Sequence, residues 1–223
     1  MLLLEERVER AIKPTRLALE QVETALIHYQ EQMQKHGLGK LIAQGRVSAN
    51  IGLEFMKLQY IDSTLWVPML AIMKDRVKHP TLKKALTDNL LCEAGAKHTS
   101  HVTLCAEFLI SKGIDPYFGD LYHYSPLAKH PTEIMNSVIR MSEAEIAGWI
   151  MIAETIVPDL FRLVHPLLTV DGEEHGEWMM RSIRELIQDG TPVEEILHGL
   201  HLGGRVALAV PDALYAKALR GLP

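Results

Sequence analysis

Three features are scarce in this sequence, and each scarcity argues against a class of protein. Only two of the 223 residues are cysteines, Cys92 and Cys105, which argues against a fold held together by disulfides. No run approaches the roughly 20 apolar residues that a bilayer span requires, so we expect no membrane-spanning segment. Basic residues are not in excess, because the formal net charge is −5, and this argues against a nucleic-acid-binding protein.

The first residues also lack the features of a secretion signal. Three leucines follow Met1, but Glu5, Glu6 and Arg7 come directly after them, so there is neither a basic start nor a long apolar run. Together with the few cysteines, this start predicts a cytoplasmic protein. The length predicts a single domain, residues 1–223, that is large enough to bury a sizeable core.

Strand-type alternation is scarce as well, and apolar residues instead recur at the spacing of α-helices. Glycines and prolines, beginning with Pro14, divide the chain at plausible breaks. We predict about seven helices, over residues 15–36, 41–77, 81–112, 132–140, 142–164, 167–189 and 192–219. The stretch 113–130 is predicted to be a loop, which either covers a pocket or is an aromatic-anchored connection. The sequence thus predicts an all-α bundle.

Polar residues interrupt the apolar stripe of the predicted helix 81–112. The stripe consists of Leu82, Leu86, Leu90, position 93, position 97, position 101, Cys105 and Phe108. Its step is close to the 3.6 residues of a helical turn, so all of these positions should face the core. Glu93, Lys97 and His101 occupy the three middle positions.

Two further predicted helices show the same interruption. Glu154 stands on the apolar stripe of helix 142–164. Asp171 and His175 stand on the stripe of helix 167–189, four residues apart and therefore on one face. If the chain turns at His165-Pro166, Glu154 and the Asp171/His175 pair each lie about 13 Å from that turn, at one depth in the bundle.

Inward-facing carboxylates need a partner, because an unpaired carboxylate in an apolar core is costly. A pair of metal ions bound by three carboxylates and two imidazoles is one physical answer. Each residue also has a simpler explanation. His101 alone is typical of a hydrogen-bonded core histidine, Glu93 can pair with Lys97, and Asp171 can cap a helix. The coincidence across three helices favours the metal.

Three motifs at these positions resemble those of the heme-oxygenase-like diiron oxidases and oxygenases, relatives of the TenA and PqqC proteins. The first runs from Asn89-Leu-Leu-Cys-Glu93 to Ser100-His101-Val-Thr-Leu and ends at Gly113. The second is Glu154-Thr-Ile-Val-Pro158, and the third is Val170-Asp171-Gly-Glu-Glu-His175-Gly. They resemble the N-x-x-x-E…H-x-x-L, E-x-x-x-P and D-x-x-x-H segments of that family, in the same order, within approximately residues 50–210.

The resemblance implies a seven-helix heme-oxygenase-like bundle with iron ligands at Glu93, His101, Glu154, Asp171 and His175. It implies two iron ions that activate O2 for the oxidation of a small organic substrate, an amino-acid-like or fatty-acid-like carboxylate. The reactions of the family include hydrogen abstraction, oxidative cleavage and N-oxygenation. Proteins of this kind often form homodimers, and a net charge of −5 does not prevent dimerisation.

The sequence departs from the family at one ligand position. Leu167 stands where the family commonly has a further histidine, one turn before the aspartate. We therefore expect the second iron to be bound weakly, or its ligand set to be completed by His98, His165 or Glu174.

Two readings without metal remain open at this point. The first is a metal-free TenA-like hydrolase or small-molecule-binding protein, although neither Cys92 nor Cys105 lies in an activating Cys–His pattern. The second is a helical interaction protein whose inward polar residues form a structural hydrogen-bond network. Cofactor-free oxidation of the PqqC kind would require a basic pocket, and no basic cluster is evident in the sequence.

Overall fold

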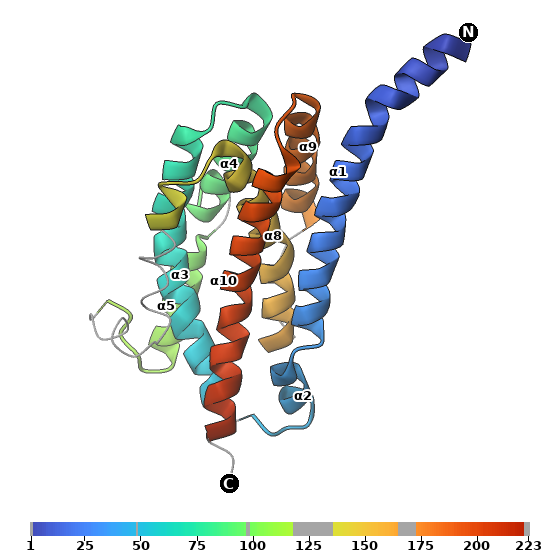
Figure 1. Cartoon of the computed structure of the whole chain (residues 1–223). Coiled ribbons are helices and arrows are strands. Elements are labelled where there is room, and N and C mark those ends of the chain that lie inside the picture. The colour runs from blue at the N-terminus through green and yellow to red at the C-terminus, as the bar shows by residue number, and fades with distance from the viewer. Residues whose placement is uncertain (1, 48, 97–98, 118–135, 165–172, 221–223) are drawn as a thin grey trace.

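The computed structural model is a bundle of α-helices (Figure 1) and describes residues 2–47, 49–96, 99–117, 136–164 and 173–220. Within these ranges, the side chains of residues 2–13, 49, 164 and 173–178 are outside the description. The helices are α1 (Leu2–Gln34), α2 (Gly37–Ala43), α3 (Ala49–Arg76), α4 (Pro80–Glu93), α5 (His101–Ser111), α8 (Glu143–Val164), α9 (Glu173–Gln188) and α10 (Val193–Arg220). No strand occurs in these ranges, so the predicted all-α class is confirmed.

Several helix boundaries agree with the sequence prediction, and one predicted break is wrong. Helices α8 and α10 begin and end within one residue of the predicted ranges 142–164 and 192–219. The break predicted at Pro14 is absent, because Pro14 lies inside α1. A proline removes one backbone hydrogen bond, which can kink a helix without ending it. None of the described helices is both long and apolar enough to cross a membrane.

The prediction missed two breaks, both at glycines. The range 41–77 includes the end of α2 and the whole of α3, with a break between them, and the range 81–112 covers α4 and α5. After α4, Gly95 adopts a φ of +83°, which a glycine reaches without steric cost. The N–H of Ala96 then donates to the carbonyl of Leu91 at 2.9 Å, the closing bond of a Schellman helix end. Ser100 begins α5 by accepting a hydrogen bond from the N–H of Thr103 at 3.2 Å.

The break between α4 and α5 corrects the predicted stripe through positions 93, 97 and 101. Glu93 is the last residue of one helix and His101 is the first residue of the next. The helical period therefore does not carry across positions 94–100. His101 is an exposed residue, not the core-facing residue that a continuous helix predicted.

The tightest packing lies between α8 and α10, where two glycines let the backbones approach. A Cβ atom added to Gly148 of α8 would lie 1.9 Å from the carbonyl oxygen of Ile196. A Cβ atom added to Gly199 of α10 would lie 1.9 Å from the carbonyl oxygen of Glu145. The core on either side of this contact is apolar. It includes Phe55, Leu86, Ile150, Ile152 and Leu200, all fully buried.

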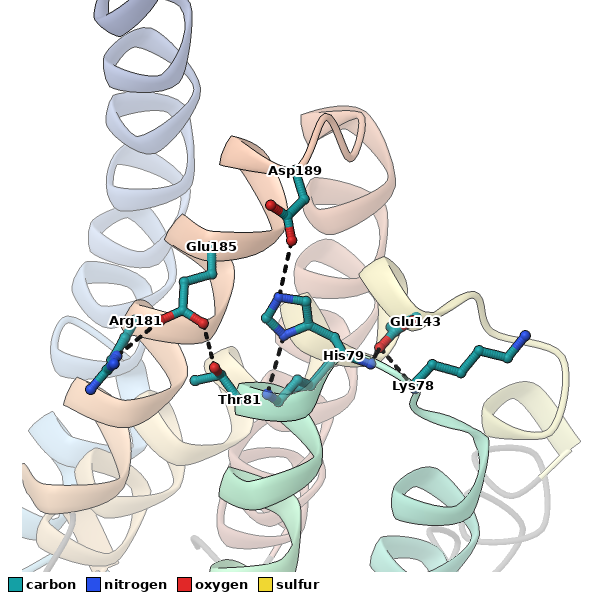
Figure 2. A network of polar contacts seen from close by, with 8 residues as sticks. Lys78, His79, Thr81, Glu143, Arg181, Glu185 and Asp189 are labelled. Atoms are coloured by element: carbon teal, nitrogen blue, oxygen red, sulfur yellow. Dashed lines mark hydrogen bonds and ion pairs between the residues drawn. The ribbon is translucent and has the colours of Figure 1, made fainter.

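Polar contacts fasten α4, α8 and α9 together at one end of the bundle (Figure 2). The Nε2 atom of His79, which precedes α4, lies 3.5 Å from Oδ2 of Asp189, which follows α9. The backbone N–H of His79 donates to the carboxylate of Glu143, the first residue of α8. The hydroxyl of Thr81 on α4 donates to Glu185 on α9. We call this end, where α4 and α8 begin and α3 and α9 end, the latched end.

Candidate functional site

The depth of each candidate ligand in the bundle can be measured along its helix from the latched end. Glu93 ends α4, Glu154 lies in the middle of α8, and position 175 lies in the first turn of α9. With a rise of 1.5 Å per residue, these positions are about 20, 17 and 20 Å from the latched end. Helix α9 packs against both α4 and α8. Helix geometry thus brings three of the predicted ligand positions to one level of the bundle.

Asn89 on α4 connects the region of Glu93, on the same helix, with Glu154 on α8. Its amide nitrogen, Nδ2, donates a hydrogen bond of 2.5 Å to Oε1 of Glu154 across the interface between α4 and α8. Asn89 is only 5% exposed, and it lies one turn before Glu93 on the same face of α4. Asn89 and Glu154, which lie 65 residues apart in the chain, therefore bring the first and second sequence motifs into contact.

Glu93 forms an ion pair with His101, whereas Lys97, the partner that the sequence allowed for it, lies outside the described residues. Oε2 of Glu93 lies 3.0 Å from Nδ1 of His101. The side chain of Glu93 is 14% exposed and that of His101 is 57% exposed, so the pair spans from the interior to the surface. His101 is thus brought to Glu93 by the turn between α4 and α5, and not by a shared helix face.

The remaining predicted ligands cannot be placed as side chains. Asp171 lies outside the described residues, and so do Leu167, His98 and His165. His175 and Glu174 belong to α9 by their backbone, but their side chains are outside the description. Of the five predicted ligands, the structure therefore pairs Glu93 with His101 and bonds Glu154 to Asn89, which lies one turn before Glu93.

Sequence reasoning missed a further carboxylate at this level, Asp62 on α3. It lies about 21 Å from the latched end, counted along α3 at 1.5 Å per residue. Two aromatic contacts between α3 and α8 lie on either side of it: Phe55–Phe161 and Trp66–Trp149, with ring centroids 5.2 and 5.3 Å apart. The antiparallel register that these contacts set places Asp62 level with Glu154. The spacing of Asp62 from Phe55 and Trp66 could have indicated its inward position, since all three residues share one helical stripe.

Burial favours the protonated, neutral forms of the Asp62 carboxyl and of the nearby Cys105 thiol. Burial raises the pKa of Asp62 from its usual 3.8 to about 7. Burial also raises the pKa of Cys105 on α5 to about 11; a hydrogen bond with Ser63 opposes this shift, and the negative charges of Glu93 and Asp62 add to it. A thiol with this pKa carries almost no thiolate at neutral pH, so Cys105 is a poor nucleophile.

A buried polar atom of Asn89 finds no hydrogen-bond partner among the described residues. This atom is Oδ1, whereas Nδ2 of the same amide donates to Glu154. A buried carbonyl oxygen without a donor costs free energy, so this atom is suited to accept a hydrogen bond from a ligand or to bind a cation.

The ligand types at the candidate site fit iron, but the described residues alone do not supply enough ligands for an iron ion. Carboxylates and an imidazole are the oxygen and nitrogen ligands that Fe(II) accepts. Among the residues that the structure describes, no three His, Cys, Asp or Glu side chains are close enough together to hold a metal ion. A complete iron site therefore requires ligands from the part of α9 and the preceding segment whose side chains are outside the description.

No protein-family model matches this chain, and no curated protein matches it. The likeness to the heme-oxygenase-like diiron enzymes therefore rests on the three motifs quoted above.

Proposed function

We propose that this protein is an iron-dependent enzyme of the heme-oxygenase-like diiron type, an O2-activating oxidase or oxygenase of a small organic substrate. The observation that carries the proposal is the hydrogen bond from Asn89 to Glu154. It connects two motifs of the family at one depth of the bundle, next to Glu93 and its partner His101. Glu93 and Glu154 offer carboxylate ligands that iron accepts, and iron is the cation that the resemblance implies.

The proposed ligands are Glu93, His101, Glu154, Asp171 and His175. When bound, the two iron ions would supply the activation of O2 for hydrogen abstraction, oxidative cleavage or N-oxygenation. The protein's own contribution is positional. Asn89 orients the carboxylate of Glu154 through its Nδ2 donor, as outer residues do at metal sites, and Glu93 holds the ring of His101 through Nδ1. The apolar core around Asn89 shields it from water.

The metal-free alternative retains one supporting observation. The Glu93–His101 ion pair provides a partner for Glu93 without any metal. A cysteine-based hydrolase is the less favoured form of this alternative, because the raised pKa of Cys105 suppresses the thiolate that such an enzyme would use.

Iron binding by the purified protein tests the proposal directly. We expect anaerobic Fe(II) loading, followed by desalting and elemental analysis, to leave iron on the wild-type chain. Glu154→Gln, which keeps the size of the side chain and removes its charge, should lose at least one iron per chain. His175→Ala should do the same, and this variant tests the ligand on α9.

The matched control is Glu107→Gln, because Glu107 is an exposed glutamate of α5. We expect this control to keep the wild-type iron content, and helix content measured by circular dichroism should be equal in all variants. A wild-type chain without iron, or a Glu154→Gln variant with a full iron complement, would refute the metal site and favour the metal-free alternative.

A further inference from the structure

Tyr29, a buried tyrosine of α1, makes a close contact with α10. Its ring packs against Gly204, where an added Cβ atom would lie 2.5 Å from ring carbons of Tyr29. Its hydroxyl lies 3.2 Å from Nδ1 of His201 and donates to the carbonyl oxygen of His201 at 3.3 Å. Burial raises the pKa of Tyr29, so this hydroxyl remains protonated near neutral pH. The seating of α1 on α10 therefore depends on the state of His201.

Positively charged and protonatable side chains surround this contact. The imidazole rings of His28 on α1 and His201 on α10 both pack against the ring of Tyr29, with ring centroids 5.6 and 5.8 Å away. His198 and Arg205 lie one turn before and one turn after His201 on the same face of α10. Burial lowers the pKa of His201, and the positive charges of Arg205 and of the two other histidines lower it further. A proton taken up by His201 is thus placed among like charges.

The carboxylates that face these histidines have other partners. Oε1 of Glu145 on α8 lies 2.6 Å from Nδ1 of His198. Glu31 on α1 faces His28, but its carboxylate forms an ion pair of 2.6 Å with a lysine of the next turn. No described carboxylate contributes to the pKa shift of His201. Protonation of His198 therefore strengthens its contact with Glu145, whereas protonation of His201 gains no such partner.

We propose that the contact between α1 and α10 is a pH-sensitive joint, in which protonation of His201 beside His28 and Arg205 loosens α1 from the bundle. His201 is exposed, so its ring exchanges protons with water. Because its pKa is lowered in the folded chain, the stability that it contributes is present above the ordinary value of 6.5 and is lost as the pH falls from there towards the lowered value. Exposed charges interact weakly, so acid loosens this joint without unfolding the bundle. Helix α1 packs against α8, α9 and α10, and its loosening uncovers part of each.

Hydrogen exchange of the full chain, measured by mass spectrometry after pepsin cleavage, tests the joint. Protection is compared at about pH 7.5 and about pH 5.5, on either side of the usual histidine range, after correction for the intrinsic pH dependence of exchange. We expect amides of residues 22–33 in α1 to lose protection severalfold at the lower pH, while amides of residues 55–73 in α3 keep theirs. A chelator is present throughout, so the result does not depend on the proposed iron site.

Two variants assign the effect to His201 and its neighbours. His201→Gln keeps a polar side chain but takes up no proton, so α1 should be equally protected at both pH values. Arg205→Gln removes one neighbouring charge and leaves the Tyr29 contact in place, so it should reduce the acid-induced loss.

The matched control is Arg220→Gln, which removes an exposed charge at the end of the same helix and should behave like the wild type. The inference is overturned if the wild-type α1 shows no loss at the lower pH, if α3 loses as much protection as α1, or if His201→Gln loses as much as the wild type. Should His201→Gln fail to fold, equal losses in Arg205→Gln and Arg220→Gln would overturn it instead.

Discussion

Replacing Gly148 by alanine is expected to lower the free energy of unfolding by about 3 kcal/mol, near the upper end of the usual overpacking cost. The added Cβ atom would lie 1.9 Å from the carbonyl oxygen of Ile196 and 2.8 Å from the backbone nitrogen of Leu200. No rotamer change relieves a clash with backbone atoms, so α8 and α10 must move apart. The reciprocal variant, Gly199→Ala, should cost a similar amount, because its Cβ atom would meet the carbonyl oxygen of Glu145 at 1.9 Å.

Urea unfolding followed by circular dichroism measures this effect, and Gly52 supplies the matched control. Gly52 also lies inside a long helix, α3, but a Cβ atom added there meets nothing within 4 Å. Gly52→Ala should therefore raise stability by about 0.5–1 kcal/mol through helix propensity. If Gly148→Ala and Gly52→Ala had the same effect, the close backbone contact between α8 and α10 would be wrong.

Asp62→Asn is expected to stabilise the metal-free protein at pH 8 and to have little effect at pH 4. The pKa of Asp62 is about 7 in the folded chain, against a usual 3.8. Below pH 3.8, the carboxyl is protonated in both states and costs nothing. As the pH rises from 3.8 to 7, the unfolded chain releases its proton first, so folding becomes progressively less favourable. Above pH 7, the cost is constant, at about 4 kcal/mol at most from roughly 1.4 kcal/mol per pKa unit.

Urea midpoints at pH 4 and pH 8, in the presence of a chelator, check this prediction. Asp75→Asn is the control, because Asp75 is exposed on the same helix and its stability change should be small at both pH values. A gain for Asp62→Asn that is equal at pH 4 and pH 8, or a loss at pH 8, would contradict the proposed environment of Asp62.

Helix ends show where the sequence was sufficient and where it was misread. Gly113 and Gly190 adopt a positive φ after α5 and α9, and both breaks were predicted because a proline follows each glycine closely. Gly45 and Gly95 end α2 and α4 with the same hydrogen bonds, but no proline follows them, and both breaks were missed. The signal was therefore present in the sequence. A lone glycine is ambiguous because a helix tolerates it, as Gly52 shows in α3.

The sequence likewise predicted one part of the candidate site correctly and another part wrongly. The helical period of residues 142–164 correctly placed Glu154 towards the interior, where Asn89 contacts it. The same period placed His101 wrongly, because it was extended across the break at Gly95, and His101 reaches Glu93 from the start of α5 instead. Asp62 was overlooked although it stands on the stripe of Phe55 and Trp66, since one polar residue on a stripe is not informative alone.

The sequence by itself determined the helical class, the extents of α8 and α10, and which polar residues interrupt apolar stripes. These features depend on local spacing and on the conformations open to glycine and proline, so each is encoded within a few helical turns. Only the tertiary structure decided that Asn89 meets Glu154, that Asp62 lies at the level of Glu154, and that Gly148 and Gly199 admit a close helix contact. Those relations depend on the rotation and axial offset of helices that are distant in the chain, and packing and the latched end set both.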